Sequence, residues 1–511
     1  MALYFGLDVG TTGCKAGIFT ADGHLISMAY QECSVDCPAP GLAEQDTEAV
    51  WYAVRSVLRE AAVAAGLDAG EIKALSLSVQ GDAVIPVDGG GTPLGPALLG
   101  MDRRNLAEAA ELAAAVGRER LFAITGMPPH PISSLTKMVW LERHHPRVQE
   151  IAGYWHYEEY ILHRLGGRAL TDLSMASRSM AFDLLKKDYS SEILSAAGII
   201  RNKLAEAVPS GTIAGEIAPV LADELGLPRG LLLVTGGHDQ TCAALGAGAV
   251  DEGIVVDSVG TAEVCSTALP RPRLEPAMLA GGFPCYSHVV PGAWFTFALI
   301  HSGGICLRWL RDTMARAEAA EAAELGLDPY DYLTRDLPDS PGDLIFLPHL
   351  VGGGTPYGDQ GARGAFVGLT LTTTLKDMTL AVMEGLAMEF RVNLEAMARA
   401  GIKADCLRAV GGGARSERWL QIRADITGCK VETLQVREAA LLGAALLAAT
   451  ACGEFSGPAE AARRVVKKDR AYLPDPSRRV AYERRYQLYK QVYPALRQIN
   501  HGLGACESIG G

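Results

Sequence analysis

The chain has 511 residues, of which 49% are apolar, and a formal net charge of -12 at pH 7. This length predicts two or more domains. The acidic balance, with no basic cluster to reverse it, argues against a nucleic-acid-binding surface. The most apolar segment, 439–451, is too short to span a bilayer, and the first residues lack a signal-peptide pattern. We therefore expect a cytoplasmic protein with no membrane partner, whose eleven cysteines are reduced thiols.

The N-terminal segment predicts three strands joined by tight turns, with apolar runs at 4–7, 16–19 and 25–30. The first turn holds glycines together with Thr11 and Thr12, and it has Asp8 before it and Lys15 after it. Backbone N–H groups, hydroxyls and a positive charge suit an anion such as phosphate. Neither a P-loop nor a Gly-x-Gly-x-x-Gly motif opening a helix is present, so this turn alone is a weak signal.

The next part of the chain predicts mostly helices. The expected elements are a helix over 47–65 capped by Asp46-Thr47, a strand over 72–79, helices over 102–116 and 135–143, further helical segments to about 197, and a loop over 209–215.

Asp239 is the strongest candidate for a catalytic residue. It follows an apolar strand, 231–234, and two glycines, and a small-residue helix is expected over 241–249. The carboxyl end of a strand in an α/β sheet is where such folds bind ligands. The alternative is that Asp239 only caps the helix that follows.

The pattern of the N-terminal segment restarts near residue 250. Strands are expected at 254–259 and 262–266, joined by Gly260-Thr261, which repeats a hydroxyl and glycine turn after a strand. We therefore predict an N-terminal domain over 1–249 and a C-terminal domain over 250–500 built on the same plan. The further expected elements are helices at 302–317, 375–400, 416–426, 439–451 and 478–499, strands at 344–347, 407–410 and 430–434, and a loose tail at 502–511.

Several segments together resemble the FGGY family of carbohydrate kinases. The most specific is Gly364-Ala365-Phe366-Val367-Gly368-Leu369, which continues into 377–384 and fits the family's second signature. The first signature, over 134–141, fits less well because Ile132 stands where another residue type is expected. The opening segment, 7–12, and the turn at 237–240 also look like the family's.

The resemblance implies an α/β fold of two ribonuclease-H-like domains, of the actin and hexokinase superfamily, with ATP and sugar in a central cleft. Asp239 would be the general base that accepts the proton of the sugar hydroxyl as it attacks the γ-phosphate. His238 beside it would either shape the turn or react. Asp8 and Asp239 would hold Mg²⁺, mainly through water. The ATP-binding positions would be Thr11, Thr12, Lys15, Gly260, Thr261, Gly304, Gly412 and Gly413.

The substrate is less well indicated. The positions that would contact it are Gly81, Asp82, Asp102, Arg103, Asp239 and Gln240. In the resembling family xylulose kinases typically carry Met-His, and glycerol kinases Arg-Glu, where this chain has Gly81-Asp82. Asp82 could accept hydrogen bonds from two hydroxyls, Gly81 would leave room for a larger substrate or an approaching backbone, and Asp102 and Arg103 could instead form an exposed ion pair.

The function that we expect is ATP-dependent phosphorylation of a ketopentose such as D-xylulose. Gluconate, ribulose, fuculose, glycerol and a tetritol are alternative substrates, and Asp82 would repel gluconate unless Arg103 or Lys15 offset its charge. The alternative functional classes, which the sequence favours less, are a chaperone-like ATPase, a catalytically silent sugar sensor and a metal-dependent hydrolase. The family resemblance also allows a homodimer.

Overall fold

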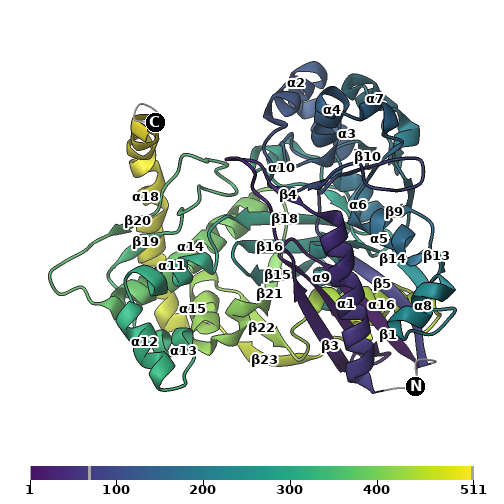
Figure 1. Ribbon diagram of the computed structural model, residues 1–511. Coiled ribbons are helices and arrows are strands. Elements are labelled where there is room, and N and C mark those ends of the chain that lie inside the picture. The colour runs from purple at the N-terminus through teal and green to yellow at the C-terminus, as the bar shows by residue number, and fades with distance from the viewer. Residues whose placement is uncertain (1, 67–70, 508–511) are drawn as a thin grey trace.

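A computed structural model of the protein describes residues 2–66 and 71–507. The N-terminal half contains a six-stranded sheet in the order β13-β14-β5-β1-β2-β3 (Figure 1). Its strands are β1 (Leu3–Val9), β2 (Gly13–Thr20), β3 (Leu25–Glu32), β5 (Ile72–Val79), β13 (Ile213–Glu216) and β14 (Leu232–His238). The meander β1-β2-β3 is antiparallel, as the sequence predicts, and β1, β5 and β14 run parallel, so their carboxyl ends meet at one edge.

The C-terminal half contains a second sheet, in the order β17-β18-β16-β15-β21-β22-β23. Its strands are β15 (Gly253–Val259), β16 (Glu263–Leu269), β17 (Tyr286–Ser287), β18 (Trp294–Ile300), β21 (Ala404–Gly411), β22 (Lys430–Leu434) and β23 (Lys468–Tyr472). The antiparallel run β15-β16-β18 and the parallel neighbours β15, β21 and β22 repeat the arrangement of the first sheet, and β17 is an additional strand at the edge. The predicted second copy of the plan is therefore confirmed.

Some helices of the N-terminal half cover its sheet, and α2, α3, α4 and α7 form a group apart from the sheet (Figure 1). The helices of this half are α1 (Thr47–Ala65), α2 (Leu106–Val116), α3 (Arg118–Thr125), α4 (Ser134–His144), α5 (Tyr157–Leu165), α6 (Leu173–Arg178), α7 (Ser191–Ala197), α8 (Pro219–Leu225) and α9 (Asp239–Gly246). Short strands between them are β4 (Glu44–Gln45), β6 (Ile85–Val87), β7 (Ala97–Leu98), β8 (Gly153–Trp155), β9 (Leu170–Asp172), β10 (Phe182–Asp183), β11 (Asp188–Tyr189) and β12 (Glu206–Val208). The Asp46 side chain caps α1 by accepting from the N–H of Glu48, and Gly66 ends it in the left-handed conformation.

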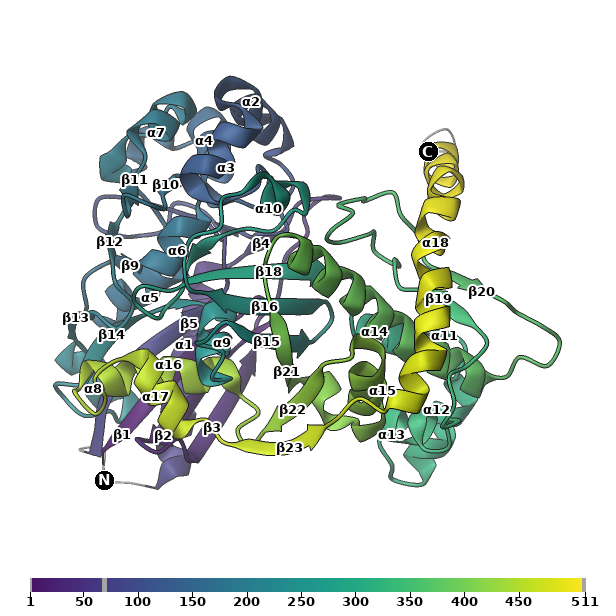
Figure 2. The same cartoon turned by 180° about the vertical axis from the view of Figure 1, so that it is seen from behind.

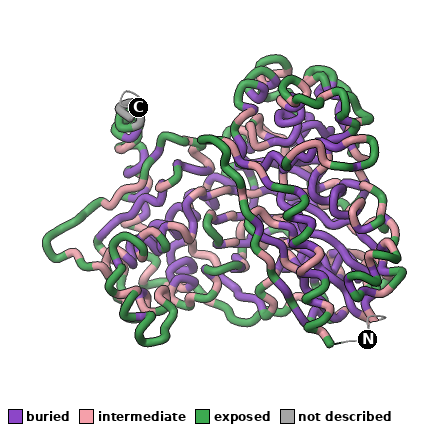
Figure 3. Tube along the Cα trace, in the orientation of Figure 1, coloured by how far each residue is buried: buried purple, intermediate pink, exposed green. Residues whose placement is uncertain are grey.

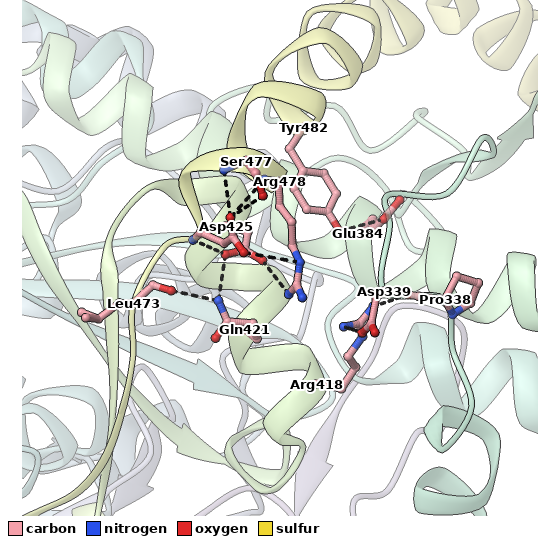
Figure 4. Close-up of polar contacts among 11 residues, drawn as sticks. Pro338, Asp339, Glu384, Arg418, Gln421, Asp425, Leu473, Ser477, Arg478 and Tyr482 are labelled. Atoms are coloured by element: carbon pink, nitrogen blue, oxygen red, sulfur yellow. Dashed lines mark hydrogen bonds and ion pairs between the residues drawn. The ribbon is translucent and has the colours of Figure 1, made fainter.

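In the C-terminal half, the last helix is docked by polar contacts. The elements are α10 (Pro276–Ala280), α11 (Ile305–Thr313), α12 (Arg316–Glu324), α13 (Pro329–Thr334), α14 (Leu375–Arg399), α15 (Glu417–Thr427), α16 (Ala439–Ala451), α17 (Pro458–Val465), α18 (Pro476–Glu507), β19 (Ile345–Leu347) and β20 (Ala365–Val367). Arg478 of α18 pairs with Asp425 of α15, and the Tyr482 hydroxyl donates to Glu384 of α14 at 3.0 Å (Figure 4). These contacts hold the first turns of α18 against α14 and α15.

Helix α16 belongs by sequence to the C-terminal half but packs on β1, β5 and α9 of the N-terminal half (Figure 2). Glycines allow this close approach: a Cβ at Gly6 would lie 2.0 Å from the Leu441 carbonyl oxygen, and one at Gly443 would lie 1.9 Å from that of Cys242. The helix is buried on nearly all sides, which explains its uniformly apolar sequence (Figure 3). None of the helices in the described ranges combines the length and apolar character that a membrane span requires.

Several predicted boundaries are wrong. Helix α9 begins at Asp239, two residues before the predicted start, so His238 occupies the N-cap position and the alternative of Asp239 as a cap is excluded. Helix α11 is shorter than predicted, and β13 forms within the predicted loop. The predicted loose tail is helical through Glu507, and the rest of it lies outside the described residues.

Candidate active site

The turn predicted to hold phosphate places Asp8 at the edge where the parallel strands end. Asp8 pairs in register with Lys15 on β2 and with Ser78 on β5. The Ser78 hydroxyl donates to Asp8 Oδ1 at 2.7 Å. Burial raises the pKa of Asp8, although this hydrogen bond and the charge of Lys15 oppose the shift. Asp8 is thus an oriented carboxylate at the mouth of the turn.

The two threonines of this turn differ in their surroundings. Thr11 donates from Oγ1 to Gln80 Oε1 at 2.9 Å, which ties the turn to the segment after β5. Thr12 is exposed. Lys15 contacts the other half of the chain, since its Nζ lies 2.8 Å from Glu438 Oε2, just before α16. A contact of Lys15 with phosphate would have to replace or share this ion pair.

The glycines predicted to bind nucleotide gather around the corresponding turn of the second sheet. They lie at Gly260-Thr261, Gly304 and Gly412-Gly413. The Gly304 N–H donates to the Gly260 carbonyl at 2.8 Å, and a Cβ at Gly413 would lie 2.8 Å from that of Val259. Gly260, Thr261 and Gly412 are exposed, so backbone groups border an open surface here. The structure therefore brings together all five predicted positions.

Asp239 is the first residue of α9 and follows β14, the strand beside β5. Side chains at the two preceding glycines are excluded, because a Cβ at Gly236 would lie 1.5 Å from the Leu77 carbonyl oxygen and one at Gly237 2.4 Å from Val289. Burial first, and then the charge of Asp8, raise the pKa of Asp239 to about 7.

His238 connects Asp239 to the second half of the chain. Its Nε2 lies 3.1 Å from Asp239 Oδ1, and its Nδ1 lies 3.0 Å from the hydroxyl of Tyr286 on β17. Burial and the charge of Arg178 lower the pKa of His238 well below its ordinary value, so the ring is neutral. The Nε2–Oδ1 contact is a close approach and not a hydrogen bond, because Oδ1 has no hydrogen-bond partner among the described residues. A neutral ring that carries its proton on Nε2 can accept at Nδ1 from the tyrosine hydroxyl.

Asp82 forms a buried ion pair with Arg178, the last residue of α6. The two side chains are 2% and 4% exposed. The guanidinium lies over the rings of Tyr286 and Phe297, 5.2 and 5.3 Å from their centres. A Cβ at Gly81 would lie 2.7 Å from the His238 ring and 3.1 Å from Arg178 Nε, so the glycine makes room for these two side chains. Room for a substrate or an approaching backbone at Gly81 stays a prediction.

The other predicted sugar contacts are less favourably placed. Asp102 is buried, and both of its oxygens accept hydrogen bonds, Oδ1 from Arg104 Nε at 2.8 Å and Oδ2 from the Ala43 N–H at 2.7 Å. The ion pair weighed as its alternative role exists, but it is buried and its cation is Arg104. Arg103 is exposed, and Gln240 is half-buried behind Asp239. A contact of these residues with sugar stays a prediction.

Comparison with known proteins identifies the family. The models for the N-terminal and C-terminal domains of the FGGY family of carbohydrate kinases match residues 3–246 and 255–452. The chain belongs to the FGGY family of carbohydrate kinases. It is 30% identical over 508 residues to a xylulose kinase of Lactococcus lactis, covering 98% of this chain and 99% of that protein. It is 30% identical over 456 residues to a gluconokinase of Bacillus subtilis, covering 88% of each. The crystal structure of xylulose kinase from Rhodospirillum rubrum superposes with a TM-score of 0.86 at 28% identity, over 98% of this chain and 100% of that one.

The residues at the strand ends fit a magnesium ion of the kind that FGGY kinases would use with ATP. Within the described ranges no cluster of three or more His, Cys, Asp or Glu could hold a metal. Asp8 and Asp239 are nevertheless close enough for the charge of one to raise the pKa of the other, and Asp239 Oδ1 is buried without a hydrogen-bond partner among the described residues. Two carboxylates completed by water and phosphate oxygens suit Mg²⁺.

Two residues of this FGGY site were not found from the sequence. Arg178 stands among small residues with no motif around it, and Tyr286 lies in a two-residue strand. The available signal for Arg178 was an arginine among small and apolar helix positions. An arginine that is buried at such a position requires a nearby carboxylate.

Proposed function

We propose that the chain transfers the γ-phosphate of ATP to a hydroxyl of a small sugar, with a ketopentose such as D-xylulose as the first candidate. The observation that carries this proposal is the placement of Asp239, a carboxylate that follows β14 where the parallel strands β1, β5 and β14 end and where β1 carries Asp8. A carboxylate at this place can accept the proton of a substrate hydroxyl. The likeness to the Lactococcus lactis xylulose kinase supports the choice of sugar.

In the proposed reaction Asp239 accepts the hydroxyl proton as the sugar oxygen attacks phosphorus in line. The neutral His238 ring lies against this carboxylate, with Nε2 3.1 Å from Oδ1. The turn with Thr11 and Thr12 and the turn with Gly260 and Thr261 hold the phosphates, and the glycines near Gly412 border adenosine. Mg²⁺, when bound by Asp8 and Asp239, supplies charge neutralisation to the phosphates. Approach of the two halves around the substrates would exclude water.

A gluconate-like acid is the second candidate substrate. It is favoured by the likeness to the Bacillus subtilis gluconokinase and by two buried cations near the sugar positions, Arg178 and Lys137. Burial lowers the pKa of Lys137 to about 8, so this amine remains mostly protonated at neutral pH.

The test is a coupled ADP-release assay with Mg²⁺-ATP and a panel of D-xylulose, L-xylulose, D-ribulose, L-ribulose, L-fuculose, gluconate, glycerol and erythritol. One sugar should raise ADP release well above the blank. Asp239→Asn should lower kcat for that sugar by about 10²–10⁴-fold, because it removes the base, while sugar binding is retained. Full activity of this variant, or ADP release that no sugar affects, would contradict the proposal.

A further inference from the structure

The strand that leads to Asp239 is irregular just before the glycine turn. Strand β14 pairs with β5 through Val234 opposite Ser76 and then through Gly237 opposite Ser78. Two residues of β14 therefore lie between paired positions where β5 has one, which is a β-bulge. A bulge re-aims the side chains that follow it, and bulges are frequent next to active sites. The position of Asp239 thus depends on what holds the bulge in place.

One N–H group of the bulge is bonded by the side chain of Glu158 on α5. The Gly236 N–H donates to Glu158 Oε1 at 2.8 Å, and the Asp172 N–H at the end of β9 donates to Glu158 Oε2 at 2.6 Å. Glu158 is fully buried, and α5 and β9 both pack against β14 (Figure 1). A buried N–H group without an acceptor is costly, so the two oxygens of Glu158 favour this irregular conformation of the strand.

A second buried side chain, Ser174 of α6, holds the residue before Asp239. Its Oγ accepts from the His238 N–H at 2.9 Å and donates to Asp172 Oδ1 at 2.9 Å. The Asp172 carboxylate also accepts from the N–H groups of Ser174 and Met175 and from the hydroxyl of Ser210. Because the Ser174 hydroxyl proton is directed to Asp172, a lone pair of Oγ remains for the His238 N–H.

The two carboxyl groups make these contacts without a cation. Glu158 and Asp172 are fully buried, and neither forms an ion pair within the described part of the chain. Burial, and then the charge of Asp172, raise the pKa of Glu158 well above its ordinary value, so Glu158 carries a proton at neutral pH. Burial also raises the pKa of Asp172, to about 6, and its four hydrogen-bond donors oppose this shift. Burying such groups costs stability, which natural proteins accept mainly at functional sites.

From these contacts we infer that Glu158 and Ser174 are positioning residues for the proposed phosphate transfer. They hold the backbone of residues 236–238 and thereby fix the Asp239 carboxylate where the parallel strands end. Without them β14 could pair regularly with β5, and a shift of one residue would displace the start of α9 and Asp239 with it. The inference rests on the proposed function and adds the residues that set the position of its general base.

The experiment measures steady-state kinetics of the full-length chain with Mg²⁺-ATP and the most active sugar of the panel. Glu158→Leu removes both acceptor oxygens, so kcat should fall by about 10- to 100-fold, as expected for a displaced reacting group, while the KM values for ATP and sugar change less than about threefold. Glu158→Gln should lower kcat by no more than about fivefold, because its amide oxygen still accepts from the Gly236 N–H. Ser174→Ala removes the acceptor of the His238 N–H and should lower kcat by about five- to tenfold.

Glu384→Leu is the matched control for Glu158→Leu. Glu384 is also a buried glutamate that accepts from a glycine N–H, that of Gly342 at 3.1 Å, but it lies in the C-terminal half on α14. This variant should have a lower thermal unfolding temperature and an unchanged kcat. The unfolding temperature also shows whether each variant is folded. If Glu158→Leu does not fold, Ser174→Ala, which removes a single hydroxyl, provides the test.

A double-mutant cycle separates positioning from a general effect on structure. In the Asp239→Asn background, Ser174→Ala should change the residual kcat by less than about twofold, because a positioning residue acts through the group that it positions. A general effect on structure would be the same in both backgrounds.

Wild-type kcat in folded Glu158→Leu and Ser174→Ala, or a full effect of Ser174→Ala in the Asp239→Asn background, would overturn the inference. Both results leave sugar-dependent ADP release and its sensitivity to Asp239→Asn intact. Failure of the proposed function would instead appear as ADP release by the wild type that no sugar affects, so the two failures are distinguishable.

Discussion

At the residue scale, the hydroxyl of Tyr286 has a role that a substitution can isolate. It lies 3.0 Å from Nδ1 of His238, whose Nε2 lies 3.1 Å from the proposed base, while the tyrosine ring supports Arg178. Tyr286→Phe keeps the ring and removes only the hydrogen bond, which is worth about 1 kcal/mol, so kcat should fall roughly five- to tenfold. The KM values for sugar and ATP should change by less than about twofold. Steady-state kinetics check this.

Tyr160→Phe is the control, because it also removes a buried tyrosine hydroxyl, which bonds to the Thr47 carbonyl, Glu48 and Arg164 away from the site. It should leave kcat unchanged. If Tyr286→Phe altered KM and not kcat, the hydroxyl would not act through the base.

The residues of the site that the sequence predicts are those in local motifs. Asp8 and Asp239 follow apolar runs and stand next to glycine turns, so strand, turn and carboxylate are all read within a few positions. Arg178 and Tyr286 could not be found in this way. Their partners, Asp82 and His238, lie 96 and 48 positions away, and no local pattern encodes such pairing.

At the scale of elements, the docking of α18 on α14 includes a carboxyl group that should make stability depend on pH. Glu384 is buried and accepts from Tyr482 (Figure 4). It also pairs with Arg485, and burial raises its pKa to about 7. The folded state therefore binds this proton more tightly than the unfolded state between about pH 4.5 and 7. Its contribution to the free energy of unfolding is fully present below pH 4.5 and is lost as pH rises to 7, by on the order of 3 kcal/mol.

Glu384→Gln removes this dependence and keeps an acceptor for Tyr482. The free energy of unfolding of the Glu384→Gln variant, minus that of the wild type, should thus increase between pH 5 and pH 8. Urea unfolding at each pH measures this difference. Glu483→Gln on α18 is the control, because a hydrogen bond from Arg391 lowers the pKa of Glu483. The contribution of that carboxylate is lost only as pH falls below its ordinary pKa of 4.5, so the stability of this variant relative to the wild type should stay constant between pH 5 and pH 8. Parallel pH profiles for the wild type and Glu384→Gln would contradict the assignment.

Elements with a strong pattern were predicted to the residue, and those without one were missed. The helices α1 and α16 and the strands β5 and β22 have the predicted bounds, since capping residues, glycines or apolar runs mark their ends. Strand β23 was not predicted because its sequence, Lys468–Tyr472, is polar and mostly exposed. It is ordered by pairing with β22, which is a tertiary contact.

At the scale of the whole molecule, the repeated arrangement of strands was predictable from the sequence. The exchange between the two halves, by which elements of one half pack against the other, was not. The turn after the first strand of each sheet reveals the repeat. Helix α16 crosses to the first sheet, and Tyr286 of the second sheet reaches the site formed by the first. Both arise from long-range packing. The proposed division at residues 249 and 250 therefore separates two halves that are joined by shared apolar clusters, one of which contains Ala249 and Val256 and another Leu245 and Leu441.

This exchange predicts that residues 1–249 do not fold alone. Ten of the thirteen residues of α16 are buried, four of them leucines, and burial of four leucines contributes roughly 6–12 kcal/mol, which is comparable to the entire stability of a typical domain. The isolated fragment should bind a hydrophobic dye and show no cooperative thermal transition. Co-expression with residues 250–511, or fusion of 439–451 through a flexible linker, should restore cooperative unfolding, because either one returns the helix to the face formed by β1, β5 and α9. A fragment 1–249 that unfolds cooperatively by itself would show that the first sheet does not need α16.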